Sequence, residues 1–111
     1  MTTVEINPGI CGLPTKVTAS SEDGQTVQLT IQSACPTIQG LQPNLKEVDA
    51  FQVCFSRFSE SPVYRAVEEN QAGEKNFKHA ACPVPAGIIK AVECEAGLAL
   101  PKQVEFTIEK S

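Results

Sequence analysis

The residues of this chain that could do chemistry are its thiols, five cysteines among 111 residues, together with a single histidine. Thiolate sulfur is a nucleophile and also a ligand for zinc and for the iron of iron–sulfur clusters. The odd number of cysteines argues against a secreted disulfide framework, so we expect reduced thiols that are buried, ligating or reactive. The setting of each cysteine then decides which ones are candidates.

Cys82 has the most distinctive setting, because it precedes two prolines in Cys82-Pro83-Val84-Pro85 where an apolar helical pattern begins. Proline is tolerated in the first turn of a helix, so this segment predicts a helix start at Cys82. A thiol in that position meets the positive end of the helix dipole, which lowers its pKa and favours the thiolate. His79, three residues earlier, could share a metal ion with Cys82 or activate its thiol.

Two further cysteines stand in turns that could aim their sulfur atoms at a shared ligand. Cys35 follows an alternating strand pattern and is itself followed by proline, which repeats the Cys-Pro junction. Cys11 lies in a loop, residues 7–14, with proline near each end and glycines that let backbone amides approach the sulfur. Cys54 borders an apolar helical stripe, and Cys94 lies on the outer face of a predicted helix. We therefore exclude these last two from any site.

Three hypotheses for function follow from these settings. The first is a metal-binding module in which Cys11, Cys35 and Cys82, with His79 as a further donor, hold one zinc ion or an iron–sulfur cluster. The second is thiol chemistry without metal, with Cys82 as a sulfur carrier or redox thiol and Cys35 or Cys11 as its resolving partner. The third is a non-catalytic protein-interaction domain with inert thiols. The sequence has no phosphate loop and no nucleophile elbow, so it points to no catalytic residue; whether the protein is an enzyme stays open, with a non-enzymatic role favoured.

Strands and helices must position these cysteines. The strands are predicted from the alternation of apolar and polar residues with a period of two. The segments with this pattern are 4–6, 16–20, 26–32 and 104–108. Asp23-Gly24 is a turn dipeptide between the second and third of them, which predicts an antiparallel hairpin. Both ends of the chain are therefore expected in one sheet.

Apolar residues at helical spacing predict helices in the middle of the chain. The first predicted helix carries an apolar stripe from Leu45 to Phe55, and the second starts at Ser61-Pro62. The third has the clearest pattern and extends from Pro83 to Ala96, with Gly97 as its cap. Residues 71–79 are polar and aperiodic, which predicts a loop. This order of elements indicates an α+β fold, in which about three helices cover an antiparallel sheet built from the N-terminal strands, the hairpin and the C-terminal strand.

Length and charge narrow the range of functions. The chain has the size of one domain, so we expect residues 1–111 to form a single globular domain. A net charge of −4, without a basic block, argues against nucleic acid and anionic membranes and leaves a protein as the expected partner. Residues 1–8 lack the features of a signal peptide and no apolar run is long enough to span a membrane, so we expect a cytoplasmic protein.

The Cys82-Pro83-x-Pro85 helix start, followed by Ile89-Lys90-Ala91 and a glycine at the helix end, resembles the Cys-Pro-x-Pro helix of TusA/SirA-type sulfur carriers. This resemblance covers only residues 82–97, and it implies that Cys82 carries a persulfide. The whole chain, with its Gly-Ile-Cys-Gly, Ala-Cys-Pro and His-x-x-Cys-Pro-x-Pro segments, more closely resembles a small prokaryotic domain family that is uncharacterised. That resemblance implies no activity.

Overall fold

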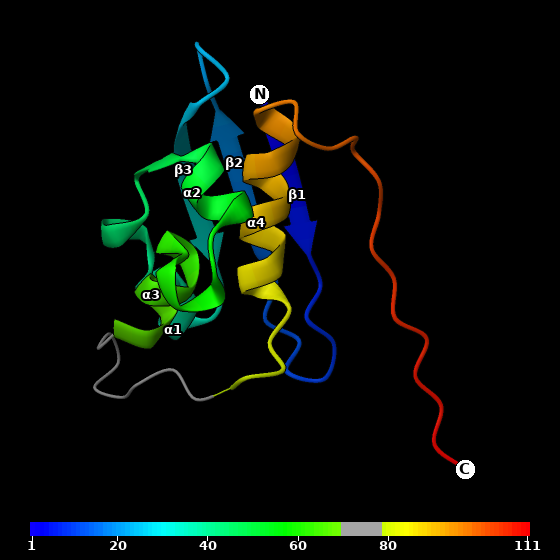
Figure 1. Ribbon diagram of the computed structural model, residues 1–111. Coiled ribbons are helices and arrows are strands. Elements are labelled where there is room, and N and C mark those ends of the chain that lie inside the picture. The colour runs from blue at the N-terminus through cyan, green and yellow to red at the C-terminus, as the bar shows by residue number, and fades with distance from the viewer. Residues whose placement is uncertain (70–78) are drawn as a thin grey trace.

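The computed structural model describes residues 1–69 and 79–111. These residues form a four-stranded antiparallel sheet packed against helices, so the predicted α+β class is confirmed (Figure 1). The loop predicted for 71–79 lies outside the described residues, apart from His79. Among the helices of the described chain, none is long and apolar enough to cross a membrane.

The sheet has the strand order β1-β2-β3-β4, and all neighbouring strands are antiparallel. The strands are β1 (Thr2–Ile6), β2 (Thr15–Ser20), β3 (Thr26–Ser33) and β4 (Glu47–Asp49). The first three lie where the alternation predicts them. On β3, Val27, Leu29 and Ile31 are buried against the helices, while the residues between them are exposed. One face of the sheet therefore supplies the core and the other faces solvent.

The turn between β2 and β3 has the predicted hairpin chemistry. Gly24 has a φ of +77°, a conformation that glycine adopts without steric cost. The Asp23 carboxylate accepts hydrogen bonds from the backbone N–H groups of Gln25 (2.9 Å) and Thr26 (2.8 Å). These bonds fix the register of the two central strands.

The helices are α1 (Pro36–Gln39), α2 (Ala50–Phe55), α3 (Pro62–Glu69) and α4 (Val84–Glu95), with short 3-10 turns η1 (Gln42–Asn44) and η2 (Phe58–Glu60). The helix predicted from Leu45 to Phe55 is wrong in its first half. Val48 instead pairs with Val27 in the sheet, and the Asp49 carboxylate caps α2 by accepting from the N–H groups of Phe51 and Gln52. The apolar stripe is therefore divided between β4 and α2.

Helix α4 packs on β1 and β2 and runs in the direction opposite to β1. Its first turn approaches the end of β1 closely: a Cβ atom added at Gly87 would lie 2.8 Å from Ile6 Cγ1. Its last turn lies beside the start of β1, where Thr2 Oγ1 donates a hydrogen bond to Glu95 Oε1 (2.8 Å). Gly97, with a φ of +75°, ends the helix as predicted, and the N–H of Leu98 donates to the carbonyl of Glu93 (2.8 Å).

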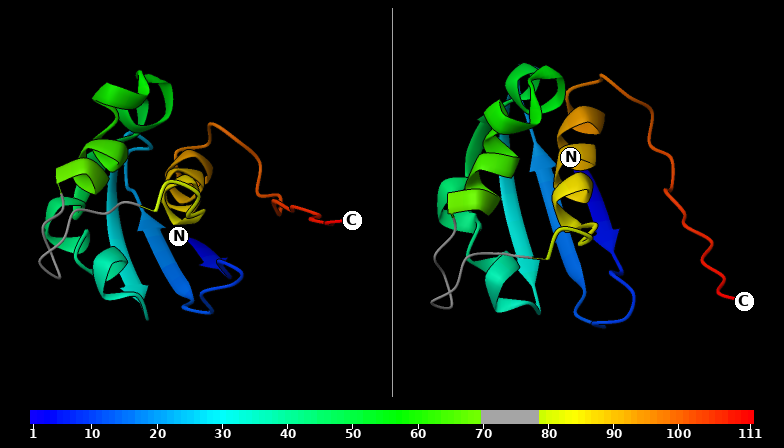
Figure 2. Two further views of the ribbon diagram at one scale, coloured as in Figure 1. Left: turned by 90° about the horizontal axis from the view of Figure 1, so that it is seen from below. Right: turned by 60° about the horizontal axis from the view of Figure 1, so that its bottom comes forward.

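The C-terminal strand is the part of the predicted sheet that the structure contradicts. Residues 100–111 contain no strand and are exposed along their whole length. Val104, Phe106 and Ile108 are 63%, 76% and 86% exposed. Both views of Figure 2 show this segment leading away from the sheet and α4. Alternation is a local property, whereas a strand also needs a neighbour to pair with, and none of the described residues pairs with this segment.

Candidate functional site

The three candidate cysteines lie in segments that meet at one end of the sheet (Figure 1). The pairing of Thr15 with both Ile6 and Ser33 brings together the end of β1, the start of β2 and the end of β3. Cys11 is in the loop that joins β1 to β2, and Cys35 follows β3. Cys82 lies two residues before α4, and the first turn of α4 packs on the end of β1. The segment that carries Cys82 therefore also lies at this end of the sheet.

Cys35 is held firmly at this end. It is the residue before the first turn of α1, as the Cys-Pro junction predicts, and it packs against the hydrophobic core. Its N–H donates to Ser33 Oγ (3.1 Å), which shares a second hydrogen bond with the buried Thr15 hydroxyl (2.7 Å). The hydroxyl pair therefore fixes the backbone that carries the thiol.

Cys11 is exposed, and its loop is tied to the fold only near its ends. Ala34 N–H donates to the carbonyl of Pro14 (3.0 Å), which joins the end of this loop to the residue before Cys35. Gly9 and Gly12 adopt positive φ angles of 95° and 66° on either side of the cysteine. Glycine makes these angles accessible, so the loop can present Cys11 to the end of the sheet.

Cys82 stands one residue farther from α4 than predicted. The helix begins at Val84, and Pro83 caps it, so Pro85 is the proline within the first turn. The expected lowering of the Cys82 pKa is wrong in direction. Burial raises the pKa of this thiol, and a hydrogen bond from the Val84 N–H lowers it but does not offset the burial.

The other two candidate cysteines also influence the pKa of Cys82. Electrostatic interaction with Cys35 and Cys11 adds a smaller contribution than burial to the raised pKa of Cys82. Within residues 1–69 and 79–111, however, no three Cys, His, Asp or Glu side chains already lie close enough to hold a metal ion.

The model of a family of unknown function, DUF6951, matches residues 2–108. The chain belongs to this family. No curated protein and no solved structure matches the chain. The expected resemblance to an uncharacterised domain family is therefore confirmed, and the match includes the alternating C-terminal segment as well as the sheet and helices.

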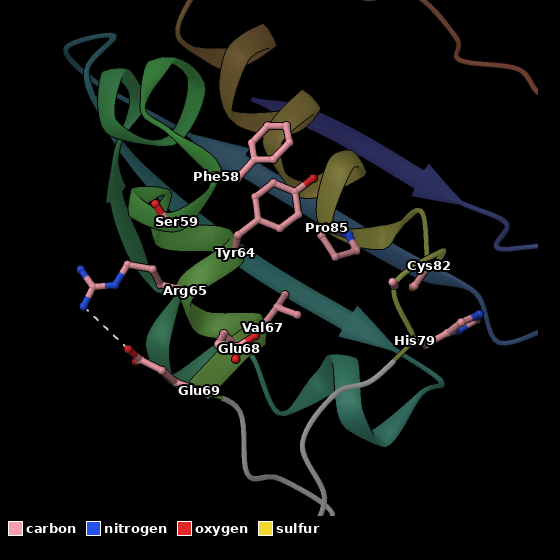
Figure 3. A pocket seen from close by; sticks show the side chains of 11 residues that line it. Phe58, Ser59, Tyr64, Arg65, Val67, Glu68, Glu69, His79, Cys82 and Pro85 are labelled. Atoms are coloured by element: carbon pink, nitrogen blue, oxygen red, sulfur yellow. Dashed lines mark ion pairs between the residues drawn. The ribbon is translucent and has the colours of Figure 1, made fainter.

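His79 is exposed at the point where the described chain resumes. Its carbonyl accepts a hydrogen bond from the Cys82 N–H (3.1 Å), which forms a turn that holds the two residues close in space. In Figure 3 its ring extends away from Tyr64 and Pro85. The exposed imidazole is thus three residues from Cys82 in the chain and belongs to the same turn.

Cys54 and Cys94, the two cysteines excluded from the site, are both partly buried. Cys54 packs against the core. Burial, with a smaller contribution from the charge of Glu93, raises its pKa to about 11. Such a thiol is protonated at neutral pH, which agrees with a packing role.

A cavity of about 640 Å³ lies beside Cys82, between α3 and the start of α4. Figure 3 shows Phe58 and Tyr64 on one side of it and Pro85 and Cys82 on the other. The two aromatic rings stack at a tilt, with their centroids 5.5 Å apart. Sequence reasoning missed this cavity, because Phe58 and Tyr64 are six positions apart and separated by a turn, and no periodic pattern connects them to Cys82.

Proposed function

We propose that the chain is a zinc-binding module in which Cys11, Cys35 and Cys82 supply three thiolate ligands. The observation that carries the proposal is the meeting of three segments, distant in the sequence, at one end of the sheet with one of these cysteines in each. Rigid turns around Cys35 and Cys82 orient two of the ligands in advance, which reduces the entropy cost of binding.

The donor set suits zinc better than an iron–sulfur cluster. Three thiolates with one imidazole form a set that zinc uses in structural sites, and His79 is the available imidazole. Clusters of the common types use four cysteine ligands. Cys54 lies on α2, which follows β4 beside the start of β3, and Cys94 lies in the second half of α4, so both are away from this end of the sheet.

Electrostatics also favours a cation between these thiols. Burial is the main cause that raises the pKa of Cys82, so the metal-free thiol holds its proton at neutral pH. A bound dication reverses this balance, because it stabilises all three thiolates at once and drives their protons off. A free nucleophilic thiolate has no such compensation.

Binding requires the 7–14 loop to close. Cys11 is exposed, whereas Cys35 and Cys82 are partly buried and packed against the core. Gly9 and Gly12 have positive φ angles. Because glycine has no Cβ atom and adopts either sign of φ, the loop backbone can change conformation at these positions at low steric cost. Zinc would then join the loop to α1 and α4 and stabilise a small domain.

The test is metal analysis of tag-free protein prepared without oxygen and supplied with one equivalent of zinc. We expect one zinc per chain in the native protein and in Cys94→Ser, which is the matched control. We expect the zinc to be lost in Cys82→Ser and Cys35→Ser, and to bind more weakly in His79→Ala.

Native protein that stays metal-free after reduction and zinc addition would refute the proposal. Retention of zinc by Cys82→Ser would refute it as well. Stoichiometric iron with visible absorption, lost in the same variants, would keep the ligands and replace zinc with a cluster.

A second candidate function is sulfur transfer by Cys82, as the Cys-Pro-x-Pro resemblance implies. The observation in its favour is the cavity beside this thiol, which could admit a donor or acceptor molecule. It predicts that iodoacetamide modifies Cys82 faster than Cys94 in metal-free protein. The raised pKa of Cys82 favours the opposite order, so equal or slower modification would exclude this candidate. A protein without metal and without a reactive thiol would be an interaction domain.

A further inference from the structure

We propose that residues 103–109 form an additional strand on the β1 edge of a second copy of this chain, so that two copies exchange their C-terminal segments. The inference does not depend on the zinc site. It rests on two features of the described chain that each lack a partner: an apolar segment with strand periodicity, and an open sheet edge.

The first feature is the C-terminal segment. Val104, Phe106 and Ile108 alternate with polar residues as they would in a strand with one covered face, yet all three are mostly exposed. Exposed apolar side chains in a regular pattern mark a surface that is covered by a partner. The family match extends to residue 108, so the segment is a shared part of the domain.

The second feature is the outer edge of β1, which no described residue pairs with. Val4 and Ile6 point toward α4 and the core but remain partly exposed, whereas Val17, opposite Val4 on β2, is fully buried. The strand contains neither proline nor lysine, which commonly protect an edge from pairing, and its one charged residue, Glu5, lies opposite Lys16 of β2. A strand added here would complete the burial of Val4 and Ile6.

The opposite edge of the sheet offers less backbone for pairing, because its outermost strand, β4, has only three residues. β4 pairs with the first residues of β3, and beyond it the side chains of Gln39 and Gln42 take over the hydrogen bonds of the β3 backbone. Gln42 bonds to Ile31 N–H and the Leu29 carbonyl, and Gln39 bonds to Ser33 N–H and the Ile31 carbonyl. β4 also carries Glu47 and Asp49, which would repel the two glutamates of the C-terminal segment. Of the two edge strands, β1 is therefore the longer and carries fewer acidic residues, one against two in β4.

The position of the segment favours exchange between two copies. The chain leaves α4 beside the start of β1, where Thr2 bonds to Glu95, and then leads away from its own sheet (Figures 1 and 2). Val104–Ile108 has the same five-residue length as β1. Two copies that meet along their β1 edges can thus each receive the segment of the other, which gives a closed, two-fold symmetric dimer.

The test is the molecular mass of the full chain in solution over a dilution series, compared with Phe106→Asp and with Thr107→Asp. The two variants introduce the same charge at adjacent positions that face opposite sides of the added strand. We expect a dimer of twice 11.9 kDa for the native chain and for Thr107→Asp. We expect Phe106→Asp to raise the dimer dissociation constant by at least about 100-fold, because it places a charge at the buried aromatic anchor.

Amide hydrogen exchange identifies the edge. The N–H groups of β1 that point outward should exchange slowly in the native dimer and rapidly in the Phe106→Asp monomer. A native chain that is monomeric at all concentrations would overturn the proposal, even with β1 protected, because the segment would then pair within its own chain. A dimer insensitive to Phe106→Asp, or one in which β1 stays unprotected, would overturn it too.

Discussion

Strand β3 and the C-terminal segment carry the same sequence signature and have opposite environments. In β3 the alternating apolar residues Val27, Leu29 and Ile31 are at most 4% exposed. In the C-terminal segment the alternating residues Val104, Phe106 and Ile108 are at least 63% exposed. Both segments have apolar residues at every second position, and most of these are β-branched or aromatic, so strand propensity does not separate them.

The two segments differ in the strands and helices that pack beside them. β3 pairs with β2 from Gln28 to Ser33 and with β4 and two glutamine side chains on the other side, and helices cover its apolar face. The C-terminal segment follows a helix cap and has no flanking strand among the described residues. Alternation therefore marks a segment that can be a strand, and the neighbours decide whether it is one.

The largest expected effect on stability comes from replacing one isoleucine by alanine in β3 and, separately, one in the C-terminal segment. Both changes are made in a Phe106→Asp background, which keeps the chain monomeric. Ile31→Ala should lower the free energy of unfolding by about 2–5 kcal/mol, because it leaves a cavity in the core. Ile108→Ala should change it by less than about 0.5 kcal/mol, because the side chain is already exposed. Urea unfolding measures both, and equal losses would show that the segment is packed on its own chain.

A smaller effect is expected where α4 meets β1, the boundary between the covered sheet and its open edge. Gly87→Ala should lower the free energy of unfolding by about 1 kcal/mol, since the overlap with Ile6 outweighs the gain in helix propensity. In an Ile6→Ala background the overlap is absent, and the same change should be neutral or stabilising. An equal loss in both backgrounds would contradict this close packing of α4 on β1.

The smallest effect is expected at Glu95, the last residue of α4 before the chain leaves the body of the fold. Its carboxylate accepts hydrogen bonds from Thr2 Oγ1 (2.8 Å) and the Ser21 N–H (3.0 Å), and lies 3.4 Å from the N-terminal amine. The Thr2 bond is the main cause that lowers the Glu95 pKa below its ordinary value of 4.5. Glu95→Gln should cost about 1 kcal/mol near neutral pH after allowance for solvent screening.

The pH dependence of this contribution has a definite sign. Because folding lowers the Glu95 pKa, the unfolded chain takes up the proton first as the pH falls. The stabilisation is therefore complete above pH 4.5 and is lost as the pH falls through the folded-state pKa. Glu95→Gln should flatten this part of the stability curve, measured by urea unfolding. Glu109→Gln, on the exposed segment, should leave the curve unchanged, and a matching response from both would contradict the contacts of Glu95.

Much of the fold could be predicted from local pattern. The alternation predicted β1, β2 and β3, and the Asp-Gly dipeptide predicted the β2–β3 hairpin. Proline and glycine predicted the start of α3 and both ends of α4 within one or two residues. The stripe from Leu45 to Phe55 could not be divided by pattern alone, because Val48 fits a helix face and a strand equally well. Its pairing with Val27, across more than twenty residues of sequence, decided in favour of the strand.

The candidate site divides in the same way. The sequence by itself determined that Cys11, Cys35 and Cys82 stand at turns or element ends, since proline and glycine act on the backbone locally. Only the tertiary structure decided that these turns share one end of the sheet, and that burial raises the Cys82 pKa where the helix start alone would lower it. Strand register, burial and the environment of the C-terminal segment all depend on contacts between distant residues. A local pattern carries no information about such contacts, because each one is made by the fold as a whole.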